Sequence, residues 1–285
     1  MNNDFSQSVF PEEYNVYESD IKSFYPERAR NTHKGTYGSA NIVAGSVKYI
    51  GAAALAAEAA LRSGCGYVKL TSCEYVKLAL AAKYPQVIFL DEPDLNSQAI
   101  AVGMGSGVNK ELYNLIERLL SEYTGTMIID ADGLNVIAEY GISLLNAVRK
   151  CRVLLTPHVK EFSRLTGINV NEILKRPIES ACAFAKEYGV ILLLKGADSI
   201  ITDGKRTSVN TRGTTALAKG GSGDMLSGYI CGTAARGLEP FESALCSAYT
   251  LGVSAEITSK EKTDYCATAK DILKNLHKAV KLLTK

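Results

Sequence analysis

The stretch GTTALAKGGSGDMLSGYI, residues 213–230, divides the chain into two parts of different character. It holds five glycines, and Asp224 is followed at once by the apolar run MLSGYI, which is typical of a buried helix. A flexible linker would keep small polar residues on both sides. We therefore interpret the segment as a glycine-rich entrance to a helix. From residue 225 the pattern is helical almost to the C-terminus.

Before this stretch, short apolar runs alternate with segments of helical spacing. The runs are NIVAG (41–45), GYVKLTS (66–72), AIAVG (99–103), TMIIDADG (126–133), CRVLLTP (151–157) and VILLLKG (190–196). This alternation predicts parallel strands joined by crossover helices. One antiparallel hairpin is expected where Asp203-Gly204 separates two alternating runs. The predicted fold is a single-domain, three-layer α/β/α structure with a mostly parallel central sheet over residues 30–285, preceded at 1–29 by an extension or a helix.

Composition favours a small-molecule partner. The chain has 285 residues, 46% of them apolar, and a net charge of +2, so no basic stripe or acidic tail suggests a nucleic acid or a membrane surface. Seven cysteines without a CxxC pair indicate a reducing cytoplasm and argue against a disulfide framework. The polar, acidic first thirty residues lack the pattern of a signal peptide, and no apolar run reaches the length of a membrane span.

Five segments are candidates for the ligand site because ligands of parallel sheets bind beyond the carboxyl ends of the strands. They are residues 44–46, 103–107, 156–161, 195–199 and the helix entrance 220–224. At the entrance, Gly220, Gly221 and Gly223 permit close backbone approach, and free N–H groups of the first helical turn would face an anion. The helix dipole would keep Asp224 ionised, able to accept a proton from a substrate hydroxyl. Ordinary helix capping is the alternative interpretation of this aspartate.

Other polar residues leave their roles open. His158 and Glu161 lie one helical turn apart, but no further ligand completes a metal site, so a hydrogen-bonding role is favoured. Asp130 and Asp132 could bind Mg²⁺ or cap the next helix. Lys195 could meet a phosphate or be a solvated strand end. Four cysteines in apolar surroundings are expected to be small core residues, namely Cys65, Cys151, Cys231 and Cys246.

The sequence contains neither a Walker-type phosphate loop nor the spacing of a dinucleotide fingerprint. Seven collinear segments nevertheless resemble one family, the NAD(P)H-hydrate dehydratases of the ribokinase-like superfamily. These segments are HKGTYGSANIVAGS (33–46), GAAALAAEAALRSGCGYVKL (51–70), GMGSG (103–107), IIDADGLN (128–135), LLTPHVKEFSRLTG (154–167), LLLKGADSIITDG (192–204) and AKGGSGDMLSGYICGTAARG (218–237). The resemblance implies a lyase that repairs the S-epimer of hydrated NADH or NADPH in a dehydration coupled to hydrolysis of ADP or ATP.

The resemblance also implies site residues. Asp224 would be the catalytic residue and would contact the hydrated nicotinamide. The expected substrate-binding residues are Ala40, Gly105, His158 and Asp224. The expected nucleotide-binding residues are Lys195, Gly196, Ala197, Asp198, Ser199 and Gly223. Mg²⁺ is the expected cofactor, with no metal ligand assigned on the protein. GMGSG stands where the family usually has GPGLG, and Val159-Lys160 replaces the usual Pro-Gly; both changes bear on substrate affinity.

Two other functions use the same residues. A small-molecule kinase for thiazole or pyrimidine alcohols would need the same helix entrance and aspartate. A nucleotide sensor without turnover would keep the pocket alone. The resemblance further suggests a cytoplasmic homo-oligomer, with a tetramer as the expected form, that uses ADP in preference to ATP. We expect any epimerase activity to come from a separate protein, because the chain has no room for that domain.

Overall fold

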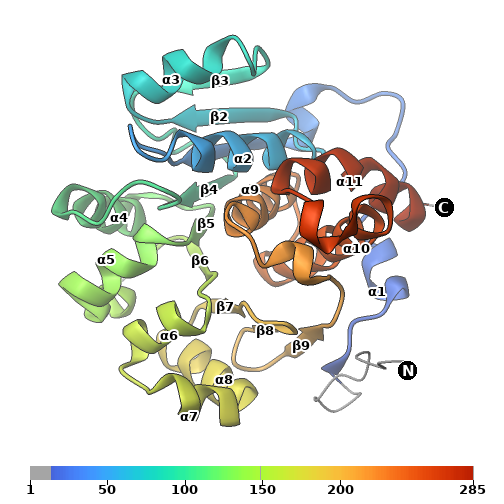
Figure 1. The fold of residues 1–285 in the computed structure, drawn as a ribbon. Coiled ribbons are helices and arrows are strands. Elements are labelled where there is room, and N and C mark those ends of the chain that lie inside the picture. Colours follow the sequence, from blue (N-terminus) through green and yellow to red (C-terminus); the bar gives the residue numbers. More distant parts are fainter. Residues whose placement is uncertain (1–13, 148, 285) are drawn as a thin grey trace, which may run out of the picture.

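A nine-stranded, mostly parallel sheet forms the centre of the computed structural model, which describes residues 14–147 and 149–284 (Figure 1). Its order is β3-β2-β1-β4-β5-β6-β7-β8-β9, parallel from β3 to β7 and antiparallel from β7 to β9. The strands are β1 (Ser39–Val43), β2 (Tyr67–Thr71), β3 (Val87–Leu90), β4 (Ala99–Val102), β5 (Thr126–Ile129), β6 (Arg152–Leu155), β7 (Ile191–Leu194), β8 (Ser199–Thr202) and β9 (Thr207–Asn210).

The six strands and the hairpin expected from the sequence are confirmed. The hairpin joins β8 to β9, with Thr202 paired to Thr207, so its turn comprises residues 203–206. The edge strand β3 was not expected. Its pattern is weak because only Val87 is buried, while the other three residues of this edge strand are partly or fully exposed.

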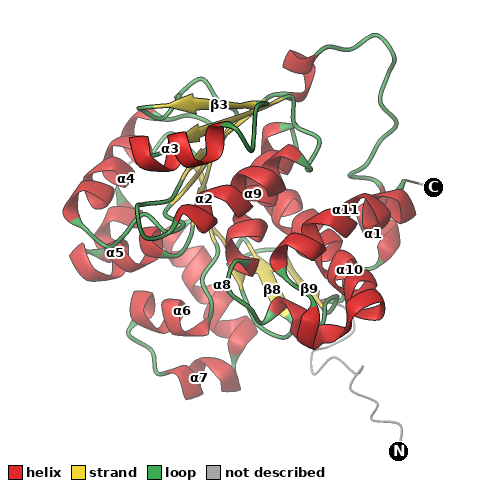
Figure 2. Ribbon diagram, turned by 45° about the horizontal axis from the view of Figure 1, so that its top comes forward, coloured by secondary structure: helices red, strands yellow, loops and turns green. Residues whose placement is uncertain are grey.

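Helices cover both faces of the sheet and complete the predicted three layers (Figure 2). One face carries α2 (Ile50–Leu61), α3 (Glu74–Ala81), α9 (Ser222–Ala235) and α10 (Pro240–Cys266), and α11 (Ala269–Leu283) packs on α10, α9 and α2. The other face carries α4 (Lys110–Glu122), α5 (Asp132–Tyr140), α6 (Val159–Thr166), α7 (Val170–Lys175) and α8 (Pro177–Tyr188). The helical pattern expected after residue 225 is therefore confirmed.

Two separate apolar cores lie between these layers. Neighbouring residues of a strand point to opposite faces, so each strand contributes to both cores. In β4, Ala101 packs on the α9 side and Ile100 on the α4 side. The small strand residues on the α9 side leave room for a helix to approach the middle of the sheet closely.

Helix α9 occupies that space and is fixed there by α2. Helix α2 contains six buried alanines and packs on α9, and a methyl group added at Gly228 of α9 would lie 2.1 Å from the carbonyl oxygen of Ala56. Only glycine permits this backbone contact. The small-residue stretch at 51–64 thus determines the position of α9 and of the glycine-rich turn at its N-terminus.

The N-terminal residues lie against the C-terminal helices. The short helix α1 (Glu18–Lys22) packs on α10 and α11, and the Tyr25 hydroxyl contacts those of Tyr229 (3.0 Å) and Thr250 (2.8 Å). Three one-turn 3₁₀ segments complete the description: η2 (Lys34–Tyr37), η3 (Ile142–Asn146) and η4 (Thr215–Leu217). Residues 1–13 lie outside the described part, and the boundary expected at residue 29 stays a prediction.

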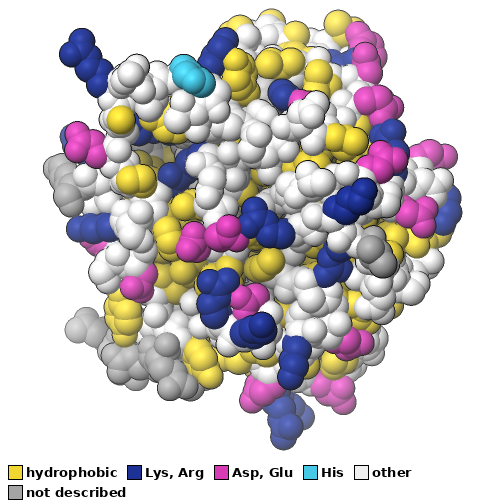
Figure 3. Space-filling model, turned by 180° about the vertical axis from the view of Figure 1, so that it is seen from behind, with side chains coloured by type: hydrophobic (Ala, Val, Ile, Leu, Met, Phe, Trp, Pro, Cys, Tyr) yellow, Lys and Arg dark blue, Asp and Glu magenta, His cyan; other side chains and the backbone are white. Residues whose placement is uncertain are grey.

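Charges of both signs are mixed on one face of the molecule. On the face shown in Figure 3, Lys and Arg side chains alternate with Asp and Glu, and no stripe of one sign crosses it. None of the helices in the described ranges has the combination of length and apolar character that crossing a membrane requires.

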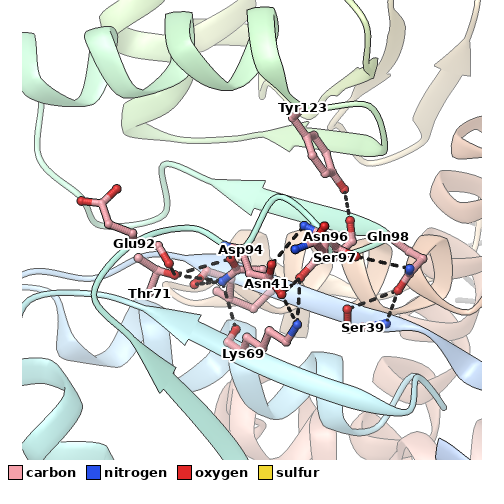
Figure 4. A network of polar contacts seen from close by, with 11 residues as sticks. Ser39, Asn41, Lys69, Thr71, Glu92, Asp94, Asn96, Ser97, Gln98 and Tyr123 are labelled. Carbon is pink, nitrogen blue, oxygen red and sulfur yellow. Dashed lines mark hydrogen bonds and ion pairs between the residues drawn. The ribbon is translucent and has the colours of Figure 1, made fainter. Parts of the chain in front are cut away.

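The connection from β3 to β4 crosses two strands without a helix. Residues 91–98 are held over β1 and β2 by a network of polar contacts (Figure 4). Buried Asn41 of β1 accepts the backbone N–H of Asp94 (2.8 Å) and donates to Thr71 of β2 (3.0 Å). Lys69 forms an ion pair with Asp94. These bonds satisfy the polar groups that an irregular segment lying on a sheet would otherwise leave unpaired.

Candidate active site

The five candidate segments meet at the carboxyl edge of the parallel strands. Their backbones are joined in pairs: Gly45 N–H donates to Met104 O (2.8 Å), and Lys195 N–H donates to Pro157 O (2.8 Å). A methyl group added at Gly223 would lie 3.4 Å from Lys195 Nζ, so the entrance of α9 reaches the end of β7. Sequence reasoning from strand ends was therefore correct about where the polar residues gather.

A buried ion pair lies at the centre of this edge. Asp130, which follows β5, has a side chain only 1% exposed, and its two oxygens accept from Lys195 Nζ (2.8 Å) and Ser227 Oγ (2.7 Å). Burial alone would lower the pKa of Lys195, but the negative charges of Asp130 and Glu161 outweigh it and raise that pKa. Lys195 is thus a charged, paired residue and not a solvated strand end. Sequence analysis missed Ser227, the hydroxyl that completes the pair.

The turn after β5 is strained. Ala131 has φ 50° and ψ −117°, a conformation that costs about 1–3 kcal/mol for a residue with a Cβ. This turn sends Asp130 inward and Asp132 toward the 103–107 loop, where its carboxylate accepts the Gly107 N–H (2.8 Å). Neither side chain provides the helix cap considered for them, and both oxygens of Asp130 are already occupied. The strained turn therefore directs Asp130 into a buried ion pair and Asp132 toward the loop at 103–107.

The glycine-rich entrance forms the N-terminus of α9. Of its three glycines, only Gly221 takes a positive φ (95°), and it is the N-cap residue. Among the described residues, no partner accepts the backbone N–H of Gly223 or Asp224. The Ser222 hydroxyl is buried and likewise has no partner there. These free donors at the positive end of a 14-residue helix form the anion-binding arrangement expected from the sequence.

Asp224 lies in the first turn of α9, half-buried, and no described residue hydrogen-bonds to its carboxylate. Burial, followed by the nearby charge of Asp130, raises its pKa to about 6, and Lys195 only partly opposes this shift. The sequence argument, which considered only the helix dipole, was therefore incomplete. Asp224 is still mostly ionised at pH 7, but it binds a proton far more readily than an ordinary aspartate, as a general base should.

His158 caps the helix that follows β6. Its Nδ1 accepts the N–H groups of Lys160 and Glu161 (both 3.1 Å), and the Glu161 carboxylate accepts the His158 N–H (2.8 Å) in return. Burial lowers the pKa of His158, so the ring is neutral at pH 7, and its Nε2 lies 3.5 Å from the Glu161 carboxylate. The expected hydrogen-bonding role is confirmed for the helix cap; contact with a substrate is a separate question.

Gly105 and Ala40 have different surroundings. Gly105 is partly exposed in the loop after β4, where an added methyl group would lie 2.8 Å from the Ala52 methyl group and 2.7 Å from Tyr49 Cβ. Ala40, by contrast, is fully buried within β1 and packs into the α9-side core. It offers no surface to a substrate, so its assignment is not supported. Ala52, on the first turn of α2, is the alanine that faces Gly105.

The segment expected to line the nucleotide connects β7 to β8. Gly196 and Ala197 are exposed, Ser199 begins β8, and burial raises the pKa of the Asp198 carboxyl. Gly223 of α9 lies near Lys195, the first residue of that segment: an added methyl group there would lie 3.4 Å from Lys195 Nζ and 3.6 Å from the Asp130 carboxylate. The two parts of the expected nucleotide site are thus neighbours, although they are separated by more than twenty residues in sequence.

In the described ranges, no group of three His, Cys, Asp or Glu side chains could hold a metal ion by itself. A magnesium ion that arrives with a nucleotide needs only one or two protein carboxylates, because phosphates and water supply its other ligands. Asp132 suits that role: it is partly exposed at this edge of the sheet, and its charge acts on the pKa of Asp224. The site therefore fits a cation that comes with its nucleotide.

Comparison with known proteins identifies relatives across the whole site. The family model described as NAD(P)H-hydrate dehydratase matches residues 40–278. An ADP-dependent (S)-NAD(P)H-hydrate dehydratase of Cenarchaeum symbiosum is 31% identical over 278 residues, covering 93% of this chain and 96% of the relative. A bifunctional NAD(P)H-hydrate repair enzyme of Hyperthermus butylicus is 35% identical over 294 residues, covering 95% of this chain and 54% of that enzyme. The chain thus spans about half the length of the bifunctional relatives.

Solved structures agree with this result. The ADP/ATP-dependent NAD(P)H-hydrate dehydratase of Bacillus subtilis, co-crystallised with ATP and Mg²⁺, superposes with a TM-score of 0.85 at 30% identity and covers 94% of this chain and 97% of its own. Similar structures include a ribokinase-like protein, which confirms the predicted fold. The chain belongs to the NAD(P)H-hydrate dehydratase family.

Proposed function

We propose that the protein dehydrates the S-epimer of hydrated NADH or NADPH back to the reduced cofactor, coupled to hydrolysis of a nucleotide. One observation supports this proposal above the others. Asp224, with a pKa of about 6, stands beside free N–H groups at the N-terminus of α9. A base and an anion-binding turn side by side suit transfer of a phosphoryl group to a substrate hydroxyl.

In the proposed reaction, Asp224 accepts the proton of the substrate hydroxyl as its oxygen forms a bond to the terminal phosphorus of the nucleotide. The bond between that phosphorus and the shortened nucleotide breaks. Hydroxide is a poor leaving group, whereas phosphate is a good one. The lone pair of the ring nitrogen then expels phosphate from the neighbouring carbon, which leaves an iminium ion. Loss of a proton from the next ring carbon to solvent forms the carbon–carbon double bond and restores the reduced nicotinamide.

The turn at Gly221–Asp224 would stabilise the charge of the transferred phosphoryl group through the free N–H groups of Gly223 and Asp224. Mg²⁺, held by Asp132 together with the phosphates, would neutralise negative charge there when bound. Lys195, fixed by Asp130, adds a positive charge beside Gly223. The buried ion pair thus keeps a cation at the site without leaving a long side chain free to move.

The nucleotide would lie between the segment Lys195–Ser199 and Gly223, and the hydrated nicotinamide between Gly105, Ala52 and His158. The closeness of Gly223 to Lys195 and of Gly105 to Ala52 supports this division. We propose ADP as the donor, in keeping with the name of the Cenarchaeum relative, and keep ATP as the alternative because the Bacillus relative is named for both.

An absorbance assay in the band of the reduced nicotinamide tests the proposal. Purified protein, Mg²⁺ and hydrated NADH or NADPH are mixed with ADP or ATP in parallel reactions. We expect the absorbance to recover with release of inorganic phosphate, faster with ADP. Absence of recovery with either nucleotide, while nucleotide still binds, would contradict the proposal.

Other products would identify the alternatives. Accumulation of a phosphorylated alcohol from thiazole or pyrimidine substrates would indicate a kinase, and nucleotide binding without any turnover would indicate a sensor. We also propose a homo-oligomer, with a tetramer as the expected form, in a reducing cytoplasm, with an epimerase supplied by a separate protein. The mass of the protein in solution and the redox state of its seven free thiols test the first two points.

A further inference from the structure

Lys219 has an unusual environment. It lies three residues before the start of α9, half-buried, and its ammonium group donates to three backbone carbonyl oxygens. These belong to Asp264 (2.8 Å), Tyr265 (2.7 Å) and Ala267 (2.6 Å). An ammonium group has three N–H donors, so all of them are used.

The three carbonyls converge because helix α10 is kinked near its end. Thr263 has φ 66° and ψ 156°, which breaks the helical path just before Asp264. The last carbonyls of a helix lack partners within the helix and carry the negative end of its dipole. Lys219 therefore caps the end of α10 from a distant part of the chain and supplies the charge that this end favours.

A row of other contacts joins the same two segments. Glu256 forms a bidentate ion pair with Arg212 and accepts the Gly213 N–H (3.0 Å). The Thr214 hydroxyl contacts that of Ser259 (2.7 Å). η4 (Thr215–Leu217) packs on α10 (Figure 1). Residues 212–219 are thus held along α10 by hydrogen bonds and packing, and Lys219 makes the last of these contacts before Gly220 and Gly221.

After Lys219, the residues of the turn make few contacts with the rest of the protein. Gly220 has no other atom within 4 Å of the position of an added methyl group, and Gly221 is the N-cap with a positive φ. The Lys219 carbonyl accepts the Ser222 N–H (3.3 Å), which closes the turn. Both ends of this turn, the Lys219 ammonium and the helix α9, are anchored, and the free donors of Gly223 and Asp224 follow directly in the first turn of α9.

We propose that Lys219 is a positioning residue whose ammonium group takes the place of a bound monovalent cation. Hydrogen-bonded to the carbonyl oxygens of residues 264, 265 and 267, this group fixes the turn that positions Asp224 and the free N–H groups. This inference rests on the proposed function for its kinetic readout. A misplacement of about 1 Å at such a site can cost about 100-fold in rate. Removal of the ammonium group leaves three inward-facing carbonyls, which a free ammonium ion can fill.

The test uses Lys219→Ala and Lys219→Met, assayed with hydrated NADH and ADP at constant ionic strength. We expect kcat to fall by about 10- to 100-fold, the Kd for ADP to rise, and the KM for the hydrate to change little. Ammonium chloride should restore kcat of Lys219→Ala several-fold and saturably, whereas tetramethylammonium chloride, which has no N–H donor, should not. The wild-type rate should not depend on ammonium.

Lys262→Ala is the matched control. Lys262 lies on the same end of α10 and pairs with Asp271 (2.7 Å), but it contacts no described residue of the turn. It should keep the wild-type kcat with or without ammonium. Wild-type kinetics in both Lys219 variants, or recovery equal in the two salts, would overturn the proposal. If Lys219→Ala folds only with ammonium present, the same salt comparison applied to circular dichroism gives the answer.

The two proposals can fail separately. If the wild-type protein does not dehydrate hydrated NADH, the proposed function fails. The role of Lys219 is then tested by ADP affinity alone, which should weaken in Lys219→Ala and recover with ammonium. If the wild-type protein is active and ammonium has no specific effect on the variants, only the inference about Lys219 fails.

Discussion

Two regions of this protein pair a lysine with an aspartate, yet their chemistry differs. In the 91–98 connection, Lys69 and Asp94 belong to a closed network in which Asp94 also accepts from the Asn96 N–H (3.0 Å) and from Ser97 (3.3 Å). At the carboxyl edge, Lys195 and Asp130 pair within a buried site, and Asp224 stands beside them without a hydrogen-bond partner among the described residues. In the first region, the aspartate accepts hydrogen bonds from neighbouring residues. In the second region, the N–H groups of Gly223 and Asp224 and the Asp224 carboxylate have no partner among the described residues.

The pKa shifts report this difference. Burial alone would raise the pKa of Asp94, but the hydrogen bonds from Lys69 and the Asn96 N–H outweigh it and lower that pKa. For Asp224, burial and the charge of Asp130 dominate, and the pKa rises to about 6. In this protein, the carboxylate that is hydrogen-bonded by its neighbouring lysine has a lowered pKa, whereas the buried carboxylate whose neighbouring lysine is paired with another acid has a raised pKa.

The largest effect is expected from Asp224→Asn. An amide cannot accept the hydroxyl proton, so turnover should fall by about 100- to 10,000-fold, the range that general-base catalysis contributes. ADP affinity should change little because the backbone N–H groups remain. Steady-state kinetics and calorimetry of ADP binding measure the two quantities. Asp94→Asn is the control in the other region and should keep its turnover; a comparable loss there would contradict the distinction.

Asp224→Asn should also stabilise the protein at neutral pH. The folded-state pKa of about 6 lies above the ordinary value of 3.8, so ionised Asp224 destabilises the fold above pH 6, and this cost disappears as the pH falls toward 3.8. The shift corresponds to about 3 kcal/mol at most. Urea unfolding should show the gain at pH 8 and a smaller one at pH 5. A loss of stability at pH 8 would show that the carboxylate has a partner.

The two ion pairs should differ in their contribution to folding. Lys195→Met leaves Asp130, 1% exposed, with Ser227 as its remaining partner, and should cost about 3 kcal/mol, as loss of one partner of a buried pair does. Lys69→Met leaves Asp94, 23% exposed, with two other donors, and should cost about 1 kcal/mol. Urea unfolding at pH 7.5 compares them. Equal losses would mean that the two regions are equivalent in energy.

The pH dependence of kcat/KM sharpens the comparison further. Because Asp224 must be ionised to act as a base, kcat/KM should be flat above pH 7 and fall about tenfold per pH unit well below 6. Asp94→Asn should keep this acid limb in place. A limb near pH 4 would show that Asp224 behaves as an ordinary aspartate, contrary to the effect of Asp130.

The sequence predicted the fold well where local patterns decide it. The six apolar runs are buried central strands, and the glycine-rich entrance is the start of α9. The edge strand β3 escaped notice because an edge strand with exposed residues has a weak apolar pattern. Ala40 was assigned to the substrate site from the resemblance of motifs, but it lies within β1 and is a core residue.

The electrostatics of the site depend on contacts that no local pattern contains. Asp130 and Lys195 are 65 residues apart, and Ser227 lies on a third element. A sequence argument can attach Asp224 to a helix N-terminus, but it cannot know that another carboxylate lies beside it. The direction of the pKa shift of Asp224 could therefore be derived only from the assembled edge of the sheet.

The smallest effect concerns His158, which the site uses as a helix cap. His158→Ala removes the acceptor for the N–H groups of Lys160 and Glu161 and should cost about 1 kcal/mol of stability. Asparagine is a good N-cap, so His158→Asn should restore most of that stability. If the ring also contacts the hydrated nicotinamide, both variants should raise KM for the hydrate to a similar extent despite their different stabilities. If the KM for the hydrate instead recovers in His158→Asn together with stability, the role of His158 is limited to capping α6. Its side chain would then serve the fold alone, as the polar side chains of the 91–98 connection do.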